Sequence, residues 1–142
     1  MKKIILVLTA LCWAFISCNS AKKTMSNTTS LEGTWELNYV TGPRIAFGGL
    51  YPNNKPTITF NLKENSVSGS SSCNRYSGKL NLVGNKISFK DPMAMTRMFC
   101  PGEGENVYMS TLQKIDSYSV SEDGKTLNFI MGDIAMMRFE KK

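Results

Sequence analysis

The chain has 142 residues, a formal net charge of +6 and no histidine. This length indicates one domain that can bury a core. The absence of histidine excludes His-based acid–base catalysis, Ser-His and Cys-His dyads, and the usual zinc sites. The lysines and arginines are scattered rather than gathered into a stripe with interleaved aromatic residues, so we do not expect a nucleic-acid partner.

The first 18 residues, MKKIILVLTALCWAFISC, have the layout of a bacterial lipoprotein signal peptide. A basic start (Lys2, Lys3) precedes an apolar run, and a small residue stands directly before Cys18. The run is shorter than the about 20 residues of a membrane-spanning helix but fits the apolar part of a signal. A plain secretory signal would need a small residue where Phe15 stands, and lipoprotein signals usually have leucine there. We therefore predict a signal peptide over residues 1–17 and lipid attachment at Cys18.

A lipidated Cys18 would carry a diacylglycerol on its thiol and an acyl chain such as palmitate on its new amine. Two or more chains give stable membrane anchoring, whereas one gives an affinity of only about 10⁴ M⁻¹. Residues 18–30 are polar and predict a flexible tether, which leaves residues 31–142 as the folded domain. Asn19 stands where some inner-membrane lipoproteins have a retaining aspartate, which favours the outer membrane of the cell envelope.

Short apolar–polar alternations, separated by turn signals, predict eight strands in the rest of the chain. In the first strand, alternation places Trp35, Leu37 and Tyr39 on one face. The predicted strands cover residues 34–40, 57–62, 67–71, 75–83, 86–89, 117–121, 126–131 and 134–140. The predicted turns include residues 64–65, 84–85, 123–124 and 132–133.

Two segments depart from this pattern. Residues 41–55 are rich in glycine and proline and predict a long loop whose apolar members pack back on the domain, namely Ile45, Phe47, Leu50 and Tyr51. Residues 103–115 place apolar side chains at helical spacing, with acidic residues in the first turn, and predict one helix. The fold class is therefore mainly β with one helix, as a sandwich or a small barrel-like antiparallel sheet.

Two stretches stand out from the strand pattern, around Cys73-Asn74-Arg75-Tyr76-Ser77-Gly78 and Met95-Thr96-Arg97-Met98-Phe99-Cys100-Pro101. With the opening LEGTW and the closing Met137-Arg138-Phe139, they resemble the META domain of HslJ-type envelope lipoproteins over about residues 31–140. The residues that carry the resemblance are Gly69, Asn74, Arg75, Tyr76, Gly78, Thr96, Arg97 and Met98. Ser72 departs from the glycine that such domains often have before the cysteine.

The resemblance implies a compact barrel-like sheet with one helix, residence in the cell envelope, and a role linked with envelope stress and tolerance to some antibiotics. It implies no enzymatic activity and no cofactor.

The same residues also have structural interpretations. Ser70 to Ser72 could supply a nucleophile only with a lysine as base, and a solvated strand edge or bulge is the preferred interpretation. Asn74 is predicted to form a turn, and Tyr76 to add core area with its hydroxyl at a polar rim. Arg97 lies in an apolar run and, if half-buried, would need a carboxylate or carbonyl partner.

Met93, Met95 and Met98 form a cluster that could bind Cu(I), because thioethers are soft ligands. Methionine also fills irregular cores, and histidine co-ligands are absent, so we predict packing and no metal site. The aspartates that could bind calcium are isolated from one another, at positions 91, 116, 123 and 133.

The chain has four cysteines. Cys12 would leave with the signal and Cys18 would be lipidated, which leaves Cys73 and Cys100 in an oxidising compartment. We predict a disulfide between these two, and two buried free thiols are the alternative.

The sequence therefore predicts a non-enzymatic, membrane-anchored lipoprotein that binds or supports another envelope component, with the membrane reached through the N-terminal lipid. The alternatives are a carrier of a small apolar ligand and Met-based copper handling. A sizeable cavity inside the barrel would favour the carrier, whereas a solid core with an exposed apolar patch would favour a protein partner.

Overall fold

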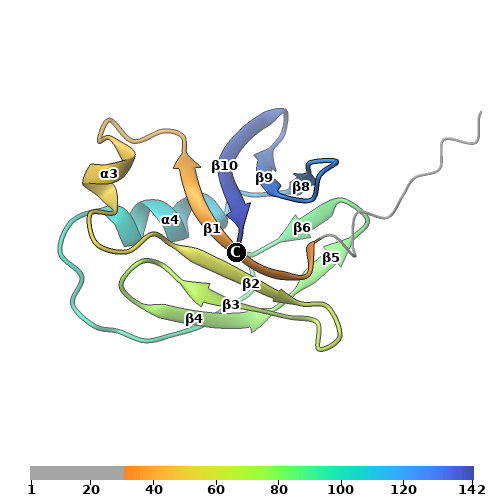
Figure 1. Ribbon diagram of the computed structural model, residues 1–142. Coiled ribbons are helices and arrows are strands. Elements are labelled where there is room, and N and C mark those ends of the chain that lie inside the picture. The colour runs from red at the N-terminus through yellow and green to blue at the C-terminus, as the bar shows by residue number, and fades with distance from the viewer. Residues whose placement is uncertain (1–30) are drawn as a thin grey trace, which may run out of the picture.

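The computed structural model describes residues 31–142, which form one ten-stranded antiparallel sheet curled into a half-barrel (Figure 1). This confirms the expectation of a mainly β, barrel-like antiparallel fold. The strands are β1 (Gly33–Val40), β2 (Thr57–Asn61), β3 (Ser66–Ser70), β4 (Arg75–Lys79), β5 (Asn81–Val83), β6 (Lys86–Ser88), β7 (Ala94–Met95), β8 (Ser117–Val120), β9 (Thr126–Met131) and β10 (Ile134–Lys141). Their order in the sheet is β5-β6-β8-β9-β10-β1-β2-β3-β4-β7.

Alternation along the strands divides the two faces of the sheet. Trp35 and Leu37 of β1 and Ile58 of β2 are fully or almost fully buried on the inner face. The prediction that Tyr39 shares this face is wrong, because the pairing of β1 with β10 shifts register between Leu37 and Tyr39. This bulge leaves Tyr39 45% exposed and turns Val40 inward.

Aromatic side chains fill the interior of the half-barrel. The ring of Phe129 lies 5.0 Å from that of Phe139, 5.3 Å from Phe89 and 6.3 Å from Phe60, measured between centroids. All four phenylalanines are at least 97% buried. The centre of the sheet is therefore a packed core.

Two helices occur in the part of the chain that the structure describes. A single turn, α3 (Phe47–Leu50), lies within the segment predicted as a loop, and α4 (Gly104–Leu112) is slightly shorter than predicted. The Tyr51 hydroxyl donates to the Gly104 carbonyl over 3.0 Å and ties the two helices together. Ile45 was expected to pack on the domain, but it is 44% exposed.

The predicted strand over residues 75–83 is divided in the structure. β4 pairs with β3, whereas β5 pairs with β6, and Leu80 between them donates its N–H to the Asn65 carbonyl over 2.8 Å. The chain thus passes from one end of the sheet to the other and brings the two ends together (Figure 1). The two-residue strand β7 was not predicted, because it has no alternation of its own.

Among the described residues, no helix is both long and apolar enough to cross a membrane.

Candidate functional site

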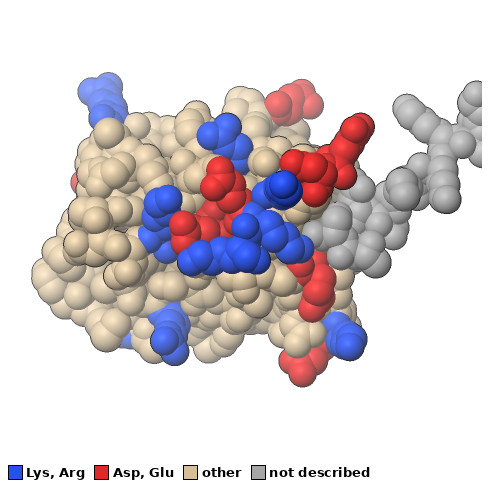
Figure 2. Space-filling model, viewed as in Figure 1, with Lys and Arg blue, Asp and Glu red and all other residues tan. Residues whose placement is uncertain are grey.

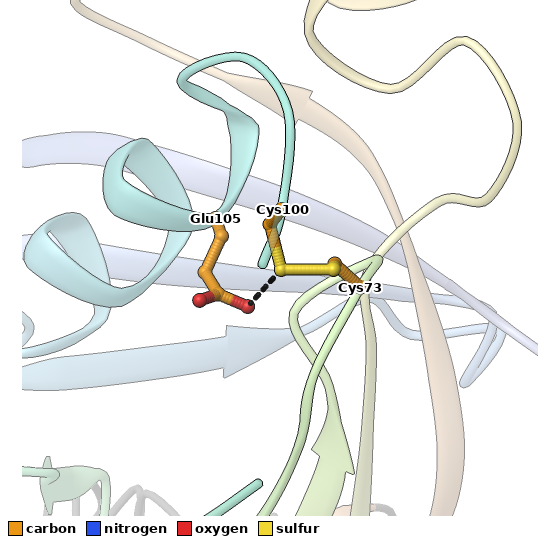
Figure 3. A group of neighbouring side chains, drawn as sticks. All are labelled: Cys73, Cys100 and Glu105. Atoms are coloured by element: carbon orange, nitrogen blue, oxygen red, sulfur yellow. Dashed lines mark hydrogen bonds between the residues drawn. A yellow bond between two sulfur atoms is a disulfide. The ribbon is translucent and has the colours of Figure 1, made fainter. Parts of the chain in front are cut away.

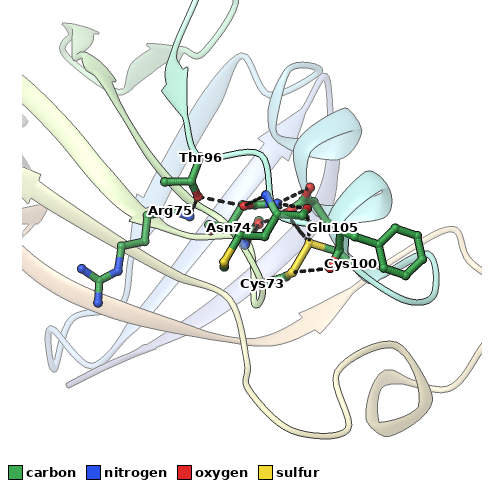
Figure 4. Close-up of a disulfide and its surroundings, with 9 residues drawn as sticks. Cys73, Asn74, Arg75, Thr96, Cys100 and Glu105 are labelled. Atoms are coloured by element: carbon green, nitrogen blue, oxygen red, sulfur yellow. Dashed lines mark hydrogen bonds between the residues drawn. A yellow bond between two sulfur atoms is a disulfide. The ribbon is translucent and has the colours of Figure 1, made fainter.

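A disulfide joins Cys73 to Cys100, as the sequence predicted (Figure 4). The two Cα atoms are 6.0 Å apart, and 27 positions separate them in the chain. Cys73 stands two residues before β4, and Cys100 lies between β7 and α4. The bridge therefore fixes the segment that enters the helix to the start of β4.

Asn74 reinforces this link with its side chain. Its Oδ1 accepts hydrogen bonds from Met98 N (2.9 Å) and Thr96 Oγ1 (2.8 Å), and its Nδ2 donates to Met98 O (3.1 Å). Asn74 is 99% buried. It therefore binds both backbone groups of Met98 as a neighbouring strand would, and holds the segment 96–100 in place (Figure 4).

The predicted turn-forming role of Asn74 describes only part of what it does: its carbonyl accepts a hydrogen bond from Ser71 N (2.8 Å) across the turn over residues 71–74. The residue with a positive φ in this turn is Ser72, at +89°, and the Asn74 side chain also bonds to a segment more than 20 positions away. A sequence pattern shows which local turn an asparagine favours, but it does not show which distant backbone groups lack a partner.

Glu105, in the first turn of α4, completes this cluster (Figure 3). Its carboxylate accepts hydrogen bonds from Ser71 Oγ, from Asn74 N (3.2 Å) and from Asn74 Nδ2 (3.1 Å). Glu105 Oε2 also lies 3.5 Å from Cys100 Sγ, which is a contact only, because a disulfide sulfur carries no proton. The helix is thus hydrogen-bonded to the same strand start that the disulfide holds.

Ser71 is fully buried, which corrects the expectation of a solvated strand edge for this residue. Its hydroxyl is surrounded by the carbonyl of Asn74 and the carboxylate of Glu105, and no lysine is among these partners. The Ser-Lys arrangement that a nucleophilic serine would require is therefore not formed at Ser71.

Beneath this cluster, two tyrosine hydroxyls meet inside the core. Tyr76 of β4 and Tyr108 of α4 are 2.6 Å apart at their hydroxyl oxygens, and Tyr76 also donates to the Thr57 carbonyl (3.0 Å). The expectation that the Tyr76 hydroxyl lies at a polar rim is wrong, since the side chain is 97% buried. Burial raises the pKa of both phenols well above the usual value.

Gly69 and Gly78 belong to this packing. A Cβ on Gly69 would lie 2.1 Å from the Thr57 carbonyl oxygen and 2.6 Å from the Tyr76 hydroxyl, so any larger residue would displace the backbone or the tyrosine. A Cβ on Gly78 would lie 2.7 Å from the Met93 side chain. Both glycines therefore permit a close approach of side chains to the sheet.

The remaining residues of the resemblance face solvent. Arg75 and Arg97 are exposed, and Met98 is 62% exposed. Arg97 is not half-buried, so it needs no buried partner. Phe99, which the sequence did not single out, is 92% exposed. We define the displayed loop as residues 96–101. It presents Arg97, Met98 and Phe99 to solvent while Asn74 and the disulfide hold its backbone.

The three methionines of the predicted cluster do not share one environment. Met93 and Met95 are partly buried and pack against the core, whereas Met98 lies on the displayed loop. Packing accounts for the first two, in the manner that the sequence predicted.

Cys73, Cys100 and Glu105 offer one potential ligand atom each, within 4.8 Å of one another (Figure 3). Both sulfurs are part of the disulfide and are not available as thiolate ligands. This group therefore acts as a structural junction in the oxidised chain.

Charges on the face of β1 and β10 are mixed. Figure 2 shows blue and red side chains side by side near the C-terminus, and Glu36 there is 2.7 Å from the Lys142 ammonium and 3.5 Å from that of Lys55. The hydrogen bond from Lys142 lowers the pKa of Glu36. Charges of both signs are therefore interspersed on this face.

The chain belongs to the META domain family, whose model matches residues 28–142. A comparison with curated proteins found no match. The chain is similar to a protein from Burkholderia xenovorans solved by NMR, with a TM-score of 0.64 and 25% sequence identity over 82% of this chain and 86% of that chain. The fold also matches a DUF4847 family protein from Bacteroides vulgatus, with a TM-score of 0.55 and 13% identity over 82% of this chain and 96% of that one. These comparisons indicate no enzyme family.

The predicted signal peptide, the tether and the lipidation site at Cys18 lie outside the residues that the structure describes. Within the described part, sequence reasoning missed Phe99 and the full role of Glu105. The signal for Phe99 was its position directly before a disulfide cysteine. For Glu105, the acidic residue at the helix start was assigned to the helix dipole alone.

Proposed function

We propose that this chain is a non-enzymatic, lipid-anchored protein of the cell envelope, in the outer membrane, whose META domain docks onto another envelope protein through the displayed loop. The lipid on Cys18 would hold the protein at the membrane, and Arg97, Met98 and Phe99 would contact the partner. Support for envelope stress tolerance would follow from that complex.

The observation that carries this proposal is the contrast between backbone and side chains in the displayed loop. Asn74 binds both backbone groups of Met98, and a disulfide fixes Cys100, yet Phe99 between them is 92% exposed. An exposed phenylalanine adds nothing to folding, so a rigid loop that displays it is better explained by binding. Arginine, aromatic residues and methionine are also enriched at protein interfaces.

The packed core argues against the alternative function, in which the domain would carry an apolar ligand inside the barrel. The aromatic rings of Phe60, Phe89, Phe129 and Phe139 occupy the interior. A packed core combined with an exposed apolar surface is the pattern expected for a protein-binding domain.

The test is site-specific photo-crosslinking in intact cells. A photoreactive amino acid at position 99 should yield one adduct with a defined envelope protein, identified by mass spectrometry. The same amino acid at position 134 is the matched control, because Ile134 is also well exposed, at 58%, but lies on the hairpin between β9 and β10.

The purified partner should then bind the parent chain directly, and Phe99→Ser should weaken this binding about tenfold or more, as for an interface hot spot. Ile134→Ser should bind as the parent does. Equal crosslinking at positions 99 and 134, or unchanged affinity of the Phe99→Ser variant, would contradict the docking role.

The anchor has a separate test. Cys18→Ala should leave an unprocessed precursor and abolish incorporation of a labelled fatty acid, while Cys12→Ala should be processed normally. Normal labelling of the Cys18→Ala variant would exclude this attachment site.

A further inference from the structure

An open groove lies beside the passage from β4 to β5, away from the displayed loop. β4 leaves β3 at Leu80, whose N–H bonds to Asn65, and β5 then pairs with β6 alone. Between these segments the groove has a volume of about 540 Å³ and is open to solvent. This is within the range of about 300–1,000 Å³ that is usual for small-molecule sites.

The floor of the groove is apolar. Leu80, Ile87 and Ile115 lie at its base and are at least 95% buried, and the half-buried Leu82 and the 81% exposed Val83 extend the apolar lining toward solvent. A hollow of similar size beside Arg75 is lined mostly by polar residues instead, including Asn53, Asn54 and Ser70.

The rim of the groove is cationic. Lys79, Lys86 and Lys90 line it, against one carboxylate, Asp116. The Asp116 carboxylate already accepts hydrogen bonds from Gly132 N and Ser117 Oγ, both at 2.7 Å. Its ion pair with Lys86 is long, at 3.9 Å between the carboxylate oxygen and the ammonium. Among the described residues, no carboxylate lies within ion-pairing distance of Lys79 or Lys90.

We propose that this groove binds a long-chain fatty acid, with its alkyl chain along the apolar floor and its carboxylate between Lys79 and Lys90. The excess of positive charge at the rim favours an anionic head over a cationic one. The apolar floor requires a tail that an inorganic anion or acetate lacks. This site shares no residue with the displayed loop and does not depend on the proposed protein partner.

The test uses photolabelling of the full chain with a dodecanoate that carries a diazirine in its alkyl chain. The readout is the labelled peptide, so labelling of the apolar leader is counted separately. Label should enter peptides that contain residues 79–90 or 115–116. Excess dodecanoate should compete with it, whereas acetate and dodecyltrimethylammonium should not.

Variants distinguish the contribution of the carboxylate from that of the alkyl chain. Lys79→Gln with Lys90→Gln should lower labelling of these peptides about fivefold or more, since two charge contacts are lost. Arg44→Gln with Lys125→Gln removes the same charge from exposed positions outside the groove and should leave labelling unchanged. Val83→Asp places a negative charge at a position that is 81% exposed and should also abolish labelling, whereas its effect on folding should be small. The Phe99→Ser variant should be labelled as the parent is.

Equal labelling of the double-lysine variant and its control would overturn the proposal. Competition by dodecyltrimethylammonium as strong as that by dodecanoate would overturn it as well, because the groove would then select only an apolar chain.

Discussion

Two surface loops of this domain hold their shape by different means. The turn over residues 121–126 is closed by its own residues: Gly124 N donates to the Ser121 carbonyl (2.9 Å), and Lys125 N donates to the Asp123 carboxylate (3.0 Å). The displayed loop is held by groups far away in sequence, namely Asn74 and Cys73. The first loop presents polar residues and the second presents Met98 and Phe99.

The difference indicates what each loop is for. A polar turn needs only to reverse the chain, and local hydrogen bonds are sufficient. An apolar loop in water would otherwise collapse onto the nearest apolar surface. The displayed loop therefore depends on long-range bonds that keep Phe99 in solvent, and removing those bonds tests this interpretation directly.

The largest expected effect follows loss of the disulfide. Cys73→Ala with Cys100→Ala should lower the free energy of unfolding by about 3–4 kcal/mol, from the entropy of closing a loop of 27 positions in the unfolded chain. Urea unfolding of the parent and the variant measures this. A reducing agent should destabilise the parent by a similar amount and leave the variant unchanged, and a parent insensitive to reduction would contradict the prediction.

Asn74→Ala should lower the free energy of unfolding by about 2–3 kcal/mol, because Met98 N–H and the Glu105 carboxylate lose a buried partner. Hydrogen exchange of the Met98 amide should accelerate in the same variant. Asn81→Ala is the matched control, since Asn81 makes one exposed side-chain bond, to Asp91 over 2.9 Å. Unchanged exchange at Met98 would show that the disulfide alone holds the loop.

The buried tyrosines below the loop predict a loss of stability in alkali. Burial raises the pKa of Tyr76 and Tyr108 well above 10, and that of Tyr51 to about 12. The unfolded chain therefore ionises first, near pH 10, so stability is complete below this pH and falls above it. The expected loss is about 1 kcal/mol for each tyrosine between pH 9 and 11.

Urea midpoints measured across this pH range check the alkaline effect. Tyr76→Phe with Tyr108→Phe should be less stable at neutral pH, because the Thr57 carbonyl loses its hydroxyl donors. Its decline with pH should nevertheless be shallower than that of the parent. An equal slope in the two proteins would assign the alkaline effect to other groups.

A substitution in the turn over residues 121–126 should destabilise the domain less than removal of the bonds that hold the displayed loop. Gly124 has a φ of +69° and no atom within 4 Å of an added Cβ, so Gly124→Ala would introduce backbone strain but no clash. The expected cost is about 1–2 kcal/mol. Thermal unfolding measures it, and hydrogen exchange at Met98 should not change, because the two loops share no hydrogen bond among those described.

These contrasts also explain which features the sequence could predict. Local patterns were sufficient for β1, for the β9–β10 hairpin and for the helix around Tyr108, because alternation, turn residues and helical spacing act over a few positions. The disulfide followed from the cysteine count. The contacts of the Asn74 side chain with Met98 and of the Ser71 hydroxyl with Glu105 could not be predicted, because these partners are more than 20 positions away. Tyr39 was assigned incorrectly because a one-residue bulge reverses the faces of the strand.

The smallest expected effect on stability is that of Phe99→Ser. The side chain is 92% exposed, so the free energy of unfolding should stay within about 0.5 kcal/mol of the parent, and the Met98 amide should keep its protection. Binding to the crosslinked partner should still fall about tenfold or more. Asn74→Ala should also lose binding, but together with stability, because it releases the whole loop. If Phe99→Ser destabilises the domain as much as Asn74→Ala does, then Phe99 has a structural role and the displayed loop is not a docking surface.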